Sequence, residues 1–243
     1  MSKIHNEVAT DCADRATSSG VAALDRAFSI VLALERTKSP MTLTEIAGAT
    51  GLYKSAVLRL MASLERSTLI VRRGDQRYVM GPLAFRLGKA FELSSHIEEN
   101  LLPLMRQLVH EGTESPSFHV RQDKETRLCL LRLDSKHSTL DRVRVGDVLP
   151  LHRGAAGKVL SRSNDRDASM GTDAVLETSF GERDPSCAAI AGPVFGPGGE
   201  IMGSLSLSGP LERFTPDLVE RMRQPLLDAC MNATRQLGGS WPW

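Results

Sequence analysis

The 243-residue chain is 41% hydrophobic and 24% charged, a composition typical of soluble globular proteins, and its length fits two domains of roughly 80 and 150 residues better than one. No apolar run approaches the roughly 18 residues that cross a bilayer, so the sequence excludes a membrane-spanning helix. The net charge of +1 is unevenly spread: residues 21–95 carry eleven Lys or Arg against six Asp or Glu, whereas residues 96–243 carry seventeen against twenty. We therefore expect only the N-terminal part to meet an anionic polymer.

The first residues and the spacing of the cysteines indicate the cellular compartment of the protein. Residues 1–19 are polar and lack the apolar stretch of a secretory signal, so we expect a flexible arm there. The four cysteines stand far apart in the sequence, which argues against a zinc module and against a disulfide framework; they are Cys12, Cys129, Cys187 and Cys230. A reducing, cytoplasmic location follows.

Two helices are predicted first. Apolar residues recur at helical spacing from Val21 to about Thr37, and Pro40 then disfavours helical geometry at the residue before it. Thr42-Leu43-Thr44-Glu45 has the form of a capping box, which starts a second, short helix. Gly51 stands where a residue in the left-handed conformation would end that helix and let the chain turn.

The next helix is the best candidate for contact with DNA. Val57, Leu60, Met61 and Leu64 fall at i, i+3, i+4 and i+7 and predict a buried stripe. Small polar and cationic side chains lie away from the stripe, most of them near the leading end, where a recognition helix reads base edges in the major groove. The candidate base-contacting or positioning residues here are Thr44, Tyr53, Lys54, Ser55 and Arg59.

A basic hairpin is predicted to follow. Leu69 to Arg73 and Gln76 to Met80 are two short strands around a turn at Gly74-Asp75. Arg72, Arg73 and Arg77 crowd this hairpin, which is small enough to lie over a phosphate backbone. The order of three helices and a basic hairpin predicts a winged helix-turn-helix over residues 20–81. Short helices joined by a tight turn also occur in bundles, and a basic hairpin is often only a solvated surface, so the pattern alone leaves that alternative open.

The rest of the chain predicts an α+β domain. Pro82 suits the first position of a linker helix, which we place at residues 82–98, and a further helix runs to Gly112. Short strand-like runs follow at residues 117–121, 127–133, 139–145, 188–195 and 201–208, the last two around the hairpin signal Gly196-Pro197-Gly198-Gly199. A helix over about 216–237 closes a domain of residues 99–243, in which strands meeting in hairpins imply an antiparallel sheet with helices packed outside.

Nothing in the second domain favours catalysis. Gly154-Ala155-Ala156-Gly157-Lys158 is similar to a phosphate loop, but His152 stands in place of its first glycine and Val159 in place of the magnesium-binding hydroxyl. The sequence contains no Gly-x-Ser-x-Gly elbow, and its histidines lack metal-ligand spacing. We therefore expect no enzyme, no catalytic residue, no metal and no cofactor, and interpret His119 and His152 as structural.

One strand suggests a ligand pocket instead. Side chains alternate along a strand, so Ser204, Ser206 and Ser208 place three hydroxyls on one face of the sheet. A solvated sheet face is the alternative. If that face looks into a cavity roofed by the loop from Leu151 to Gly157, the hydroxyls and the N–H groups at the start of the following helix can bind a carboxylate.

The ordered series of motifs resembles the IclR-type transcriptional regulators. Thr42 to Ala47, Gly51-Leu52, Lys54-Ser55, Arg59-Leu60, Tyr78 and Gly81-Pro82 follow that family's winged-helix pattern, although Ser67-Thr68 stands where the family often has a glycine. Val145-Gly146-Asp147, Leu149 to His152, Ala156-Gly157-Lys158, Ala188 to Phe195 and Ser206 to Pro210 are similar to its effector-domain signatures. The resemblance covers about residues 20–237. It implies a GAF-like effector domain whose ligand contacts Leu151, Ala155, Ala156, Ala189, Ser206 and Ser208.

The expected protein is thus a sequence-specific DNA-binding transcription regulator whose operator binding responds to a small organic acid, aromatic acids included. Its expected partners are double-stranded operator DNA, the effector, and further copies of itself as a dimer or a dimer of dimers, because a two-fold DNA site suits a two-fold protein. The alternative is a GAF-like sensory or enzymatic module that uses its winged helix for protein contacts. The sequence leaves open the effector, the operator, the regulated pathway, and whether transcription is repressed or activated.

Overall fold

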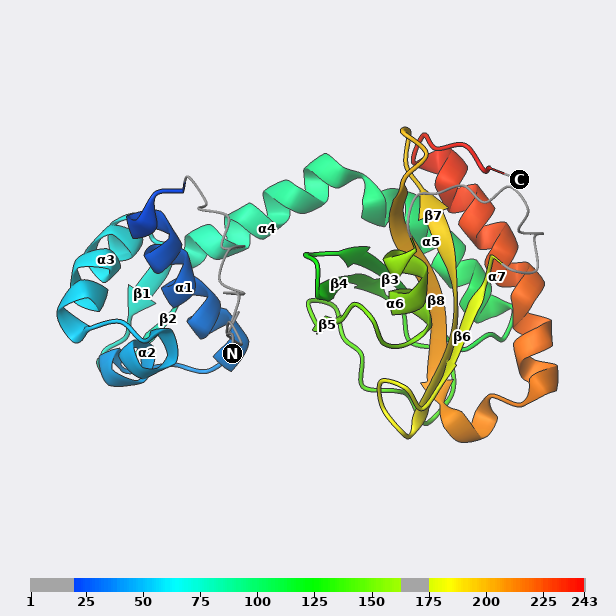
Figure 1. The fold of residues 1–243 in the computed structure, drawn as a ribbon, viewed down its shortest axis with the longest axis horizontal. Coiled ribbons are helices and arrows are strands. Elements are labelled where there is room, and N and C mark those ends of the chain that lie inside the picture. Colours follow the sequence, from blue (N-terminus) through cyan, green and yellow to red (C-terminus); the bar gives the residue numbers. More distant parts are fainter. Residues whose placement is uncertain (1–19, 163–174, 243) are drawn as a thin grey trace, which may run out of the picture. The chain divides into compact units, whose positions relative to one another are not determined.

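The computed structural model describes residues 20–162 and 175–242 (Figure 1). The arm expected at residues 1–19, with Cys12, lies outside the described residues. The chain divides into two compact units between Leu93 and Ser94. No helix in the described ranges is both long enough and apolar enough to span a bilayer.

The first unit contains three helices and a two-stranded antiparallel sheet, followed by a helix that crosses the division. The helices are α1 (Ala22–Thr37), α2 (Leu43–Thr50), α3 (Lys54–Arg66) and α4 (Pro82–Ser95), and the strands are β1 (Ile70–Arg72) and β2 (Tyr78–Met80). Their apolar faces meet in one core that includes Ile30, Ile46, Val57, Met61 and Ile70. This is the predicted winged-helix order, with strands shorter than expected at the tip of the hairpin.

Local chemistry fixes the helix ends that the sequence indicated. The Thr42 hydroxyl accepts from the Glu45 amide at 3.3 Å while the Glu45 carboxylate accepts from the Thr42 amide at 2.6 Å, which is the predicted capping box. Gly51 ends α2 with a φ of 68°, as expected. Thr68 adopts a φ of 60° between α3 and β1, so a β-branched residue occupies a left-handed conformation that glycine adopts more easily.

The second unit is a six-stranded antiparallel sheet with helices on both faces. Its elements are α5 (Ile97–His110), β3 (Ser115–Arg121), β4 (Thr126–Arg132), β5 (Val148–Pro150), α6 (Ala155–Ser161), β6 (Glu177–Phe180), β7 (Cys187–Phe195), β8 (Ile201–Pro210), the 3-10 helix η2 (Leu211–Arg213) and α7 (Pro216–Gln236). The strand order is β5-β4-β3-β8-β7-β6, with the long β7–β8 hairpin near the centre (Figure 1).

Alternate side chains of β8 point to opposite faces of the sheet. Leu205 and Leu207 are fully buried in the core that α5 and α7 form with one face of the sheet. Ser206 and Ser208 therefore point to the opposite face, which α6 covers through a small cluster that includes Ala155, Ala156 and Ala191. The pocket described below lies on this second face.

One predicted strand in this unit is wrong, and two observed strands, β5 and β6, were not predicted. Residues 139–145 form no strand: Asp141 and Val143 point inward in an irregular segment, and the sheet edge beside β4 is taken by β5 instead. The apolar alternation of residues 139–145 arises because side chains such as Val143 pack inward from this irregular segment, and not because the segment is a strand. Strand β6 was not predicted because Glu177-Thr178-Ser179-Phe180 has little apolar character, although it pairs with β7 over its whole length.

Candidate DNA-binding surface and effector pocket

Helix α3 separates a buried face from an open one. Val57, Met61 and Leu64 are buried in the core of the first unit, and Leu60 is half-buried. The predicted contact residues are all exposed; they are Thr44 on α2, Tyr53 at the N-cap of α3, and Lys54, Ser55 and Arg59 on α3. No side chain caps the amino terminus of α3, so its first N–H groups are open to a ligand. The structure thus brings four of these residues to the leading end of one helix, where the open face can meet an anionic partner.

The three hairpin arginines have different surroundings. The Arg72 guanidinium stacks over the ring of Tyr78 at 5.7 Å, and Arg73 forms an exposed ion pair with Asp75 at 3.7 Å. Arg77 instead donates to the Pro40 carbonyl at 3.1 Å and to the Glu45 carboxylate at 3.3 Å. Arg72 and Arg73 are therefore placed for contact outside the unit, whereas Arg77 ties the hairpin to the start of α2.

Glu45 is held in its charged form at this junction. Its pKa is lowered, first by the hydrogen bond from the Thr42 amide, next by the Thr42 hydroxyl, and to a smaller degree by the nearby Arg77. The carboxylate thus serves both as a helix cap and as the anchor of Arg77. The sequence identified the cap but gave no sign of the second role, which joins residues 32 positions apart.

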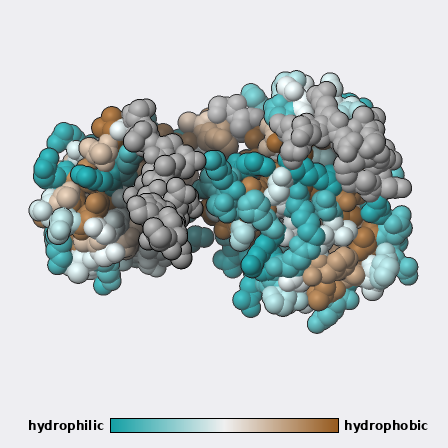
Figure 2. Space-filling model, viewed as in Figure 1, coloured by the Kyte–Doolittle hydropathy of each residue, from teal (hydrophilic) through white to brown (hydrophobic). Residues whose placement is uncertain are grey.

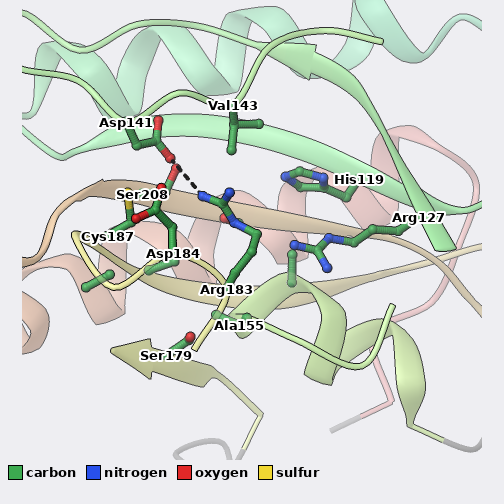
Figure 3. Close-up of a pocket in the computed structure, with 15 residues that line it drawn as sticks. His119, Arg127, Asp141, Val143, Ala155, Ser179, Arg183, Asp184, Cys187 and Ser208 are labelled. Carbon is green, nitrogen blue, oxygen red and sulfur yellow. Dashed lines mark ion pairs between the residues drawn. The ribbon is translucent and has the colours of Figure 1, made fainter. Parts of the chain in front are cut away.

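A pocket lies on the α6 face of the second unit (Figure 3). Its lining includes five of the six residues expected to contact an effector, namely Ala155, Ala156, Ala189, Ser206 and Ser208. Ser206 is 3% exposed and Ser208 is 6% exposed, which contradicts the alternative of a solvated sheet face. Ser204 is also buried, but its hydroxyl donates to the Gly192 carbonyl at 3.1 Å and serves the sheet.

Leu151 does not join this lining. Its side chain is buried beside the pocket wall, its amide donates to the Glu125 carbonyl, and its own carbonyl accepts from the Ser161 hydroxyl. A β-carbon on Gly157 would overlap the Leu151 carbonyl oxygen and would approach Arg127 Nη1 to 2.8 Å. Leu151 and Gly157 therefore fix how closely α6 packs against the loop before it.

The polar wall of the pocket was not found from the sequence. It comes from four separate segments: His119 on β3, Arg127 on β4, Asp141 in the irregular segment, and Arg183 after β6 (Figure 3). An arginine within the apolar alternation of residues 127–133 was the one available signal, since a cation on the inward face of a strand is unusual. The other three positions depend on the tertiary fold.

Burial and the repulsion between neighbouring cations lower the pKa values of His119 and Arg127 in this wall. The pKa of His119 is lowered well below its usual value, chiefly by burial and then by Arg127, Arg183 and Arg132, so the imidazole is neutral near pH 7. Its Nε2 lies 2.9 Å from the Ser117 hydroxyl. Burial and then Arg183 lower the pKa of Arg127 to about 10, which still leaves the guanidinium charged.

The phosphate-loop resemblance of residues 154–158 has no counterpart in the fold. Lys158 pairs with Glu182 and donates to the Thr178 carbonyl at 3.0 Å, so its ammonium is engaged with β6 and the turn after it. Among residues 20–162 and 175–242, no three histidine, cysteine or acidic side chains gather as metal ligands would. His152 is largely exposed, with its ring 3.8 Å from Glu125.

Comparison with known proteins shows which regulators the chain is similar to. Residues 23–74 match the model of the IclR helix-turn-helix domain. The HTH-type transcriptional regulator BhcR of Paracoccus denitrificans is 29% identical to the chain, over 90% of this chain and 87% of that protein. Residues 23–74 thus resemble an IclR helix-turn-helix domain, and over most of its length the chain is similar to IclR-type transcriptional regulators. The curated relatives BhcR, IclR and KdgR are named as transcriptional regulators or repressors.

Solved structures confirm the IclR-type fold over both units. The IclR transcriptional regulator of Alicyclobacillus acidocaldarius has a TM-score of 0.75 at 21% identity and covers 90% of this chain and 100% of its own. An IclR homologue of Microbacterium hydrocarbonoxydans, solved in complex with 4-hydroxybenzoate, has a TM-score of 0.73 at 17% identity and covers 89% and 99%. The predicted α+β class, with a helix-turn-helix domain before an antiparallel sheet domain, is thus confirmed.

Proposed function

We propose that this protein is an IclR-type regulator that binds a specific operator through α3 and the β1–β2 hairpin, and that an organic acid in the α6-side pocket changes its operator affinity. The observation that carries the first part is the exposed leading end of α3, where Lys54, Ser55 and Arg59 surround uncapped backbone N–H groups. Side chains at this end of a recognition helix reach base edges, while hairpin cations contact phosphates. Residues 20–81 would form the DNA-binding domain, with residues 82–98 as the linker and residues 99–243 as the effector domain.

Arg59 tests the DNA interface. Replacing it with alanine should weaken operator binding by about 1–3 kcal/mol while leaving binding to bulk DNA nearly unchanged, because a base contact adds affinity only at the right sequence. Arg66→Ala is the matched control, since Arg66 is an exposed cation in the last turn of the same helix. Gel-shift titrations against the DNA flanking the gene, and against random DNA, measure both. An equal loss on the two DNAs would remove Arg59 from base recognition.

The residues that line the pocket are the evidence for an organic acid as the ligand. Buried hydroxyls of Ser206 and Ser208 face two arginines, Arg127 and Arg183, and a cationic wall of this kind favours a carboxylate. The relative from Microbacterium hydrocarbonoxydans was solved with 4-hydroxybenzoate, itself a carboxylic acid. A thermal-shift screen of aliphatic and aromatic acids tests the proposal: an acid that binds the folded protein raises its melting temperature. If no acid in the screen did so, the sensing role would be rejected.

We also propose that the regulator acts as a dimer, or as a dimer of dimers. Large apolar side chains stand in solvent on α4, including Phe85 at 70%, Leu87 at 55% and Leu93 at 78% exposure, and Figure 2 shows hydrophobic surface along this helix. Contiguous apolar surface of this kind marks association sites, and a two-fold protein matches a pseudo-palindromic operator. Sedimentation velocity should show a self-associated species that Leu87→Glu shifts toward monomer. A purely monomeric wild-type protein would contradict the proposal.

A further inference from the structure

We propose that the pocket takes a small diacid, whose second acidic group replaces the Asp141 carboxylate at Arg183. This inference rests on the proposed effector function and specifies its ligand. It follows from two features of the pocket: a buried cation with no carboxylate beside it among the described residues, and a buried carboxylate that Arg183 approaches only to 3.9 Å.

Arg127 supplies the first acid-binding position. It is 3% exposed, and its Nη1 donates to the backbone carbonyls of Pro150 and Arg153, the latter at 2.8 Å. Within the described residues no carboxylate forms an ion pair with Arg127, and its Nε is buried without a hydrogen-bond partner, as is Nδ1 of His119. A buried guanidinium without a counter-charge is costly, so a ligand carboxylate is favoured here, beside Ser206.

Asp141 marks the second position. Its side chain is fully buried, with Oδ1 2.5 Å from Arg132 Nη2 and Oδ2 3.9 Å from Arg183 Nη2. Figure 3 shows the Arg183 guanidinium extended between Asp141 and His119. Arg132 is thus the near partner of this carboxylate, whereas the 3.9 Å contact of Oδ2 with Arg183 is too long for a hydrogen bond and is electrostatic only. A ligand carboxylate in direct contact with Arg183 would gain the charge-assisted hydrogen bonds that Asp141 lacks.

The other charged groups of the wall do not supply this anion. Asp184 also lines the pocket, but its carboxylate accepts from the Ser186 amide at 3.0 Å and from the Ser186 hydroxyl at 2.7 Å. Asp134 pairs with Arg132 at 2.9 Å from a position that is 60% exposed. Arg132 and Arg183 therefore share one buried carboxylate, while Arg127 has none among the described residues, and a dianion balances these cations better than a monoanion.

The open volume of the pocket is about 30 Å³, which holds water molecules but not a diacid, so binding requires the Asp141 carboxylate to move aside. Asp141 belongs to the irregular segment between β4 and β5, which is outside the sheet ladder and can shift without breaking strand pairing.

Calorimetric titration of the full-length protein tests the proposal with defined probes. Succinate and butyrate have equal chain lengths and differ by one carboxylate; at matched ionic strength we expect succinate to bind about tenfold tighter or more. Arg183→Gln should abolish most of this preference while changing butyrate affinity little, and Arg183→Lys should retain part of it. Asp141→Asn should strengthen succinate binding several-fold by removing the internal competitor.

A variant at the exposed Asp134 is the control for Asp141. Asp134→Asn removes an exposed carboxylate from the same Arg132 and should leave both affinities unchanged. Equal affinity for succinate and butyrate, or weaker succinate binding in a folded Asp141→Asn variant, would overturn the diacid proposal alone. If neither these acids nor any acid of the thermal-shift screen bound, the effector function itself would fail. Tryptophan fluorescence verifies that each variant is folded, because Trp241 packs edge-on against Phe195 at 5.4 Å.

Discussion

The two units use arginine in opposite ways. Arg59 and Arg73 of the winged-helix unit are exposed, and no buried carboxylate accompanies them among the described residues. Arg127 and Arg132 of the sheet unit are almost wholly buried, and they are held by backbone carbonyls or by Asp141. Exposed cations attract a polyanion over a distance and are screened by salt, whereas buried cations act at short range on a ligand that has left water. Under the proposed function, the same residue type would therefore contact DNA in one unit and a small anion in the other.

The largest effect that we predict tests how tightly the buried site is packed. Gly157→Ala should destabilise the sheet unit by about 1–3 kcal/mol, because the new methyl group would overlap the Leu151 carbonyl and crowd Arg127. Urea unfolding followed by far-ultraviolet circular dichroism measures it, because the helices of both units contribute to that signal. Gly48→Ala is the matched control: no atom lies within 4 Å of its added β-carbon on α2, and it should be neutral or stabilising. Similar losses at both glycines would refute the contrast in packing.

The next largest predicted effect is that the stability of the sheet unit depends on pH. The folded pKa of His119 lies well below its usual value of 6.5, so below pH 6.5 the unfolded chain takes up a proton that the folded chain does not. Stability should therefore fall as the pH falls, by about 1 kcal/mol from pH 7 to 5.5 for this group. Urea titrations at the two pH values should show that His119→Gln removes this dependence. His152→Gln, at an exposed position, should retain it; a His119→Gln variant with an unchanged slope would contradict the prediction.

A smaller effect concerns the exposed cations of the hairpin. Arg73→Gln should weaken binding to all DNA sequences alike and lower the slope of log K against log salt by about 1, because one phosphate contact is lost. Arg77→Gln should lower that slope less, since Arg77 is already engaged by Glu45 and Pro40. Fluorescence anisotropy at several salt concentrations gives both slopes. A larger change for Arg77 would reverse the roles assigned to the two arginines.

The smallest effect concerns backbone strain in the winged-helix unit. Thr68→Gly should stabilise that unit by about 0.5 kcal/mol, because relief of the left-handed conformation outweighs the entropy that glycine loses on folding. Thr68→Ala keeps the β-carbon and should bring no gain. Hydrogen exchange of amides in α1 to α3 reports on this unit, while protection in the sheet unit should stay constant. Slower exchange in both units would mean that the effect is not local.

The sequence by itself determined the parts of this protein whose physics is local. Capping chemistry at Thr42 and Glu45, the left-handed Gly51 and the 3.6-residue period of α3 specified the helix-turn-helix before any fold was known. The two-residue alternation on β8 likewise put Ser206 and Ser208 on the same side of the sheet. These features depend on residues within about two helical turns or one strand of each other, so a linear pattern contains them.

Only the tertiary structure decided what surrounds those residues. The sheet order β4-β3-β8-β7 brings Arg127, His119, Ser206 and Ala189 to one face, and the segment before β5 adds Asp141 from outside the ladder. Glu45 gains Arg77 in the same way, across 32 positions. Burial then sets the charge of each group, because removal from water changes the pKa of His119 and Arg127 without any change in their neighbours along the chain. Sequence patterns record neither long-range pairing nor desolvation, and the binding chemistry of the pocket depends on both.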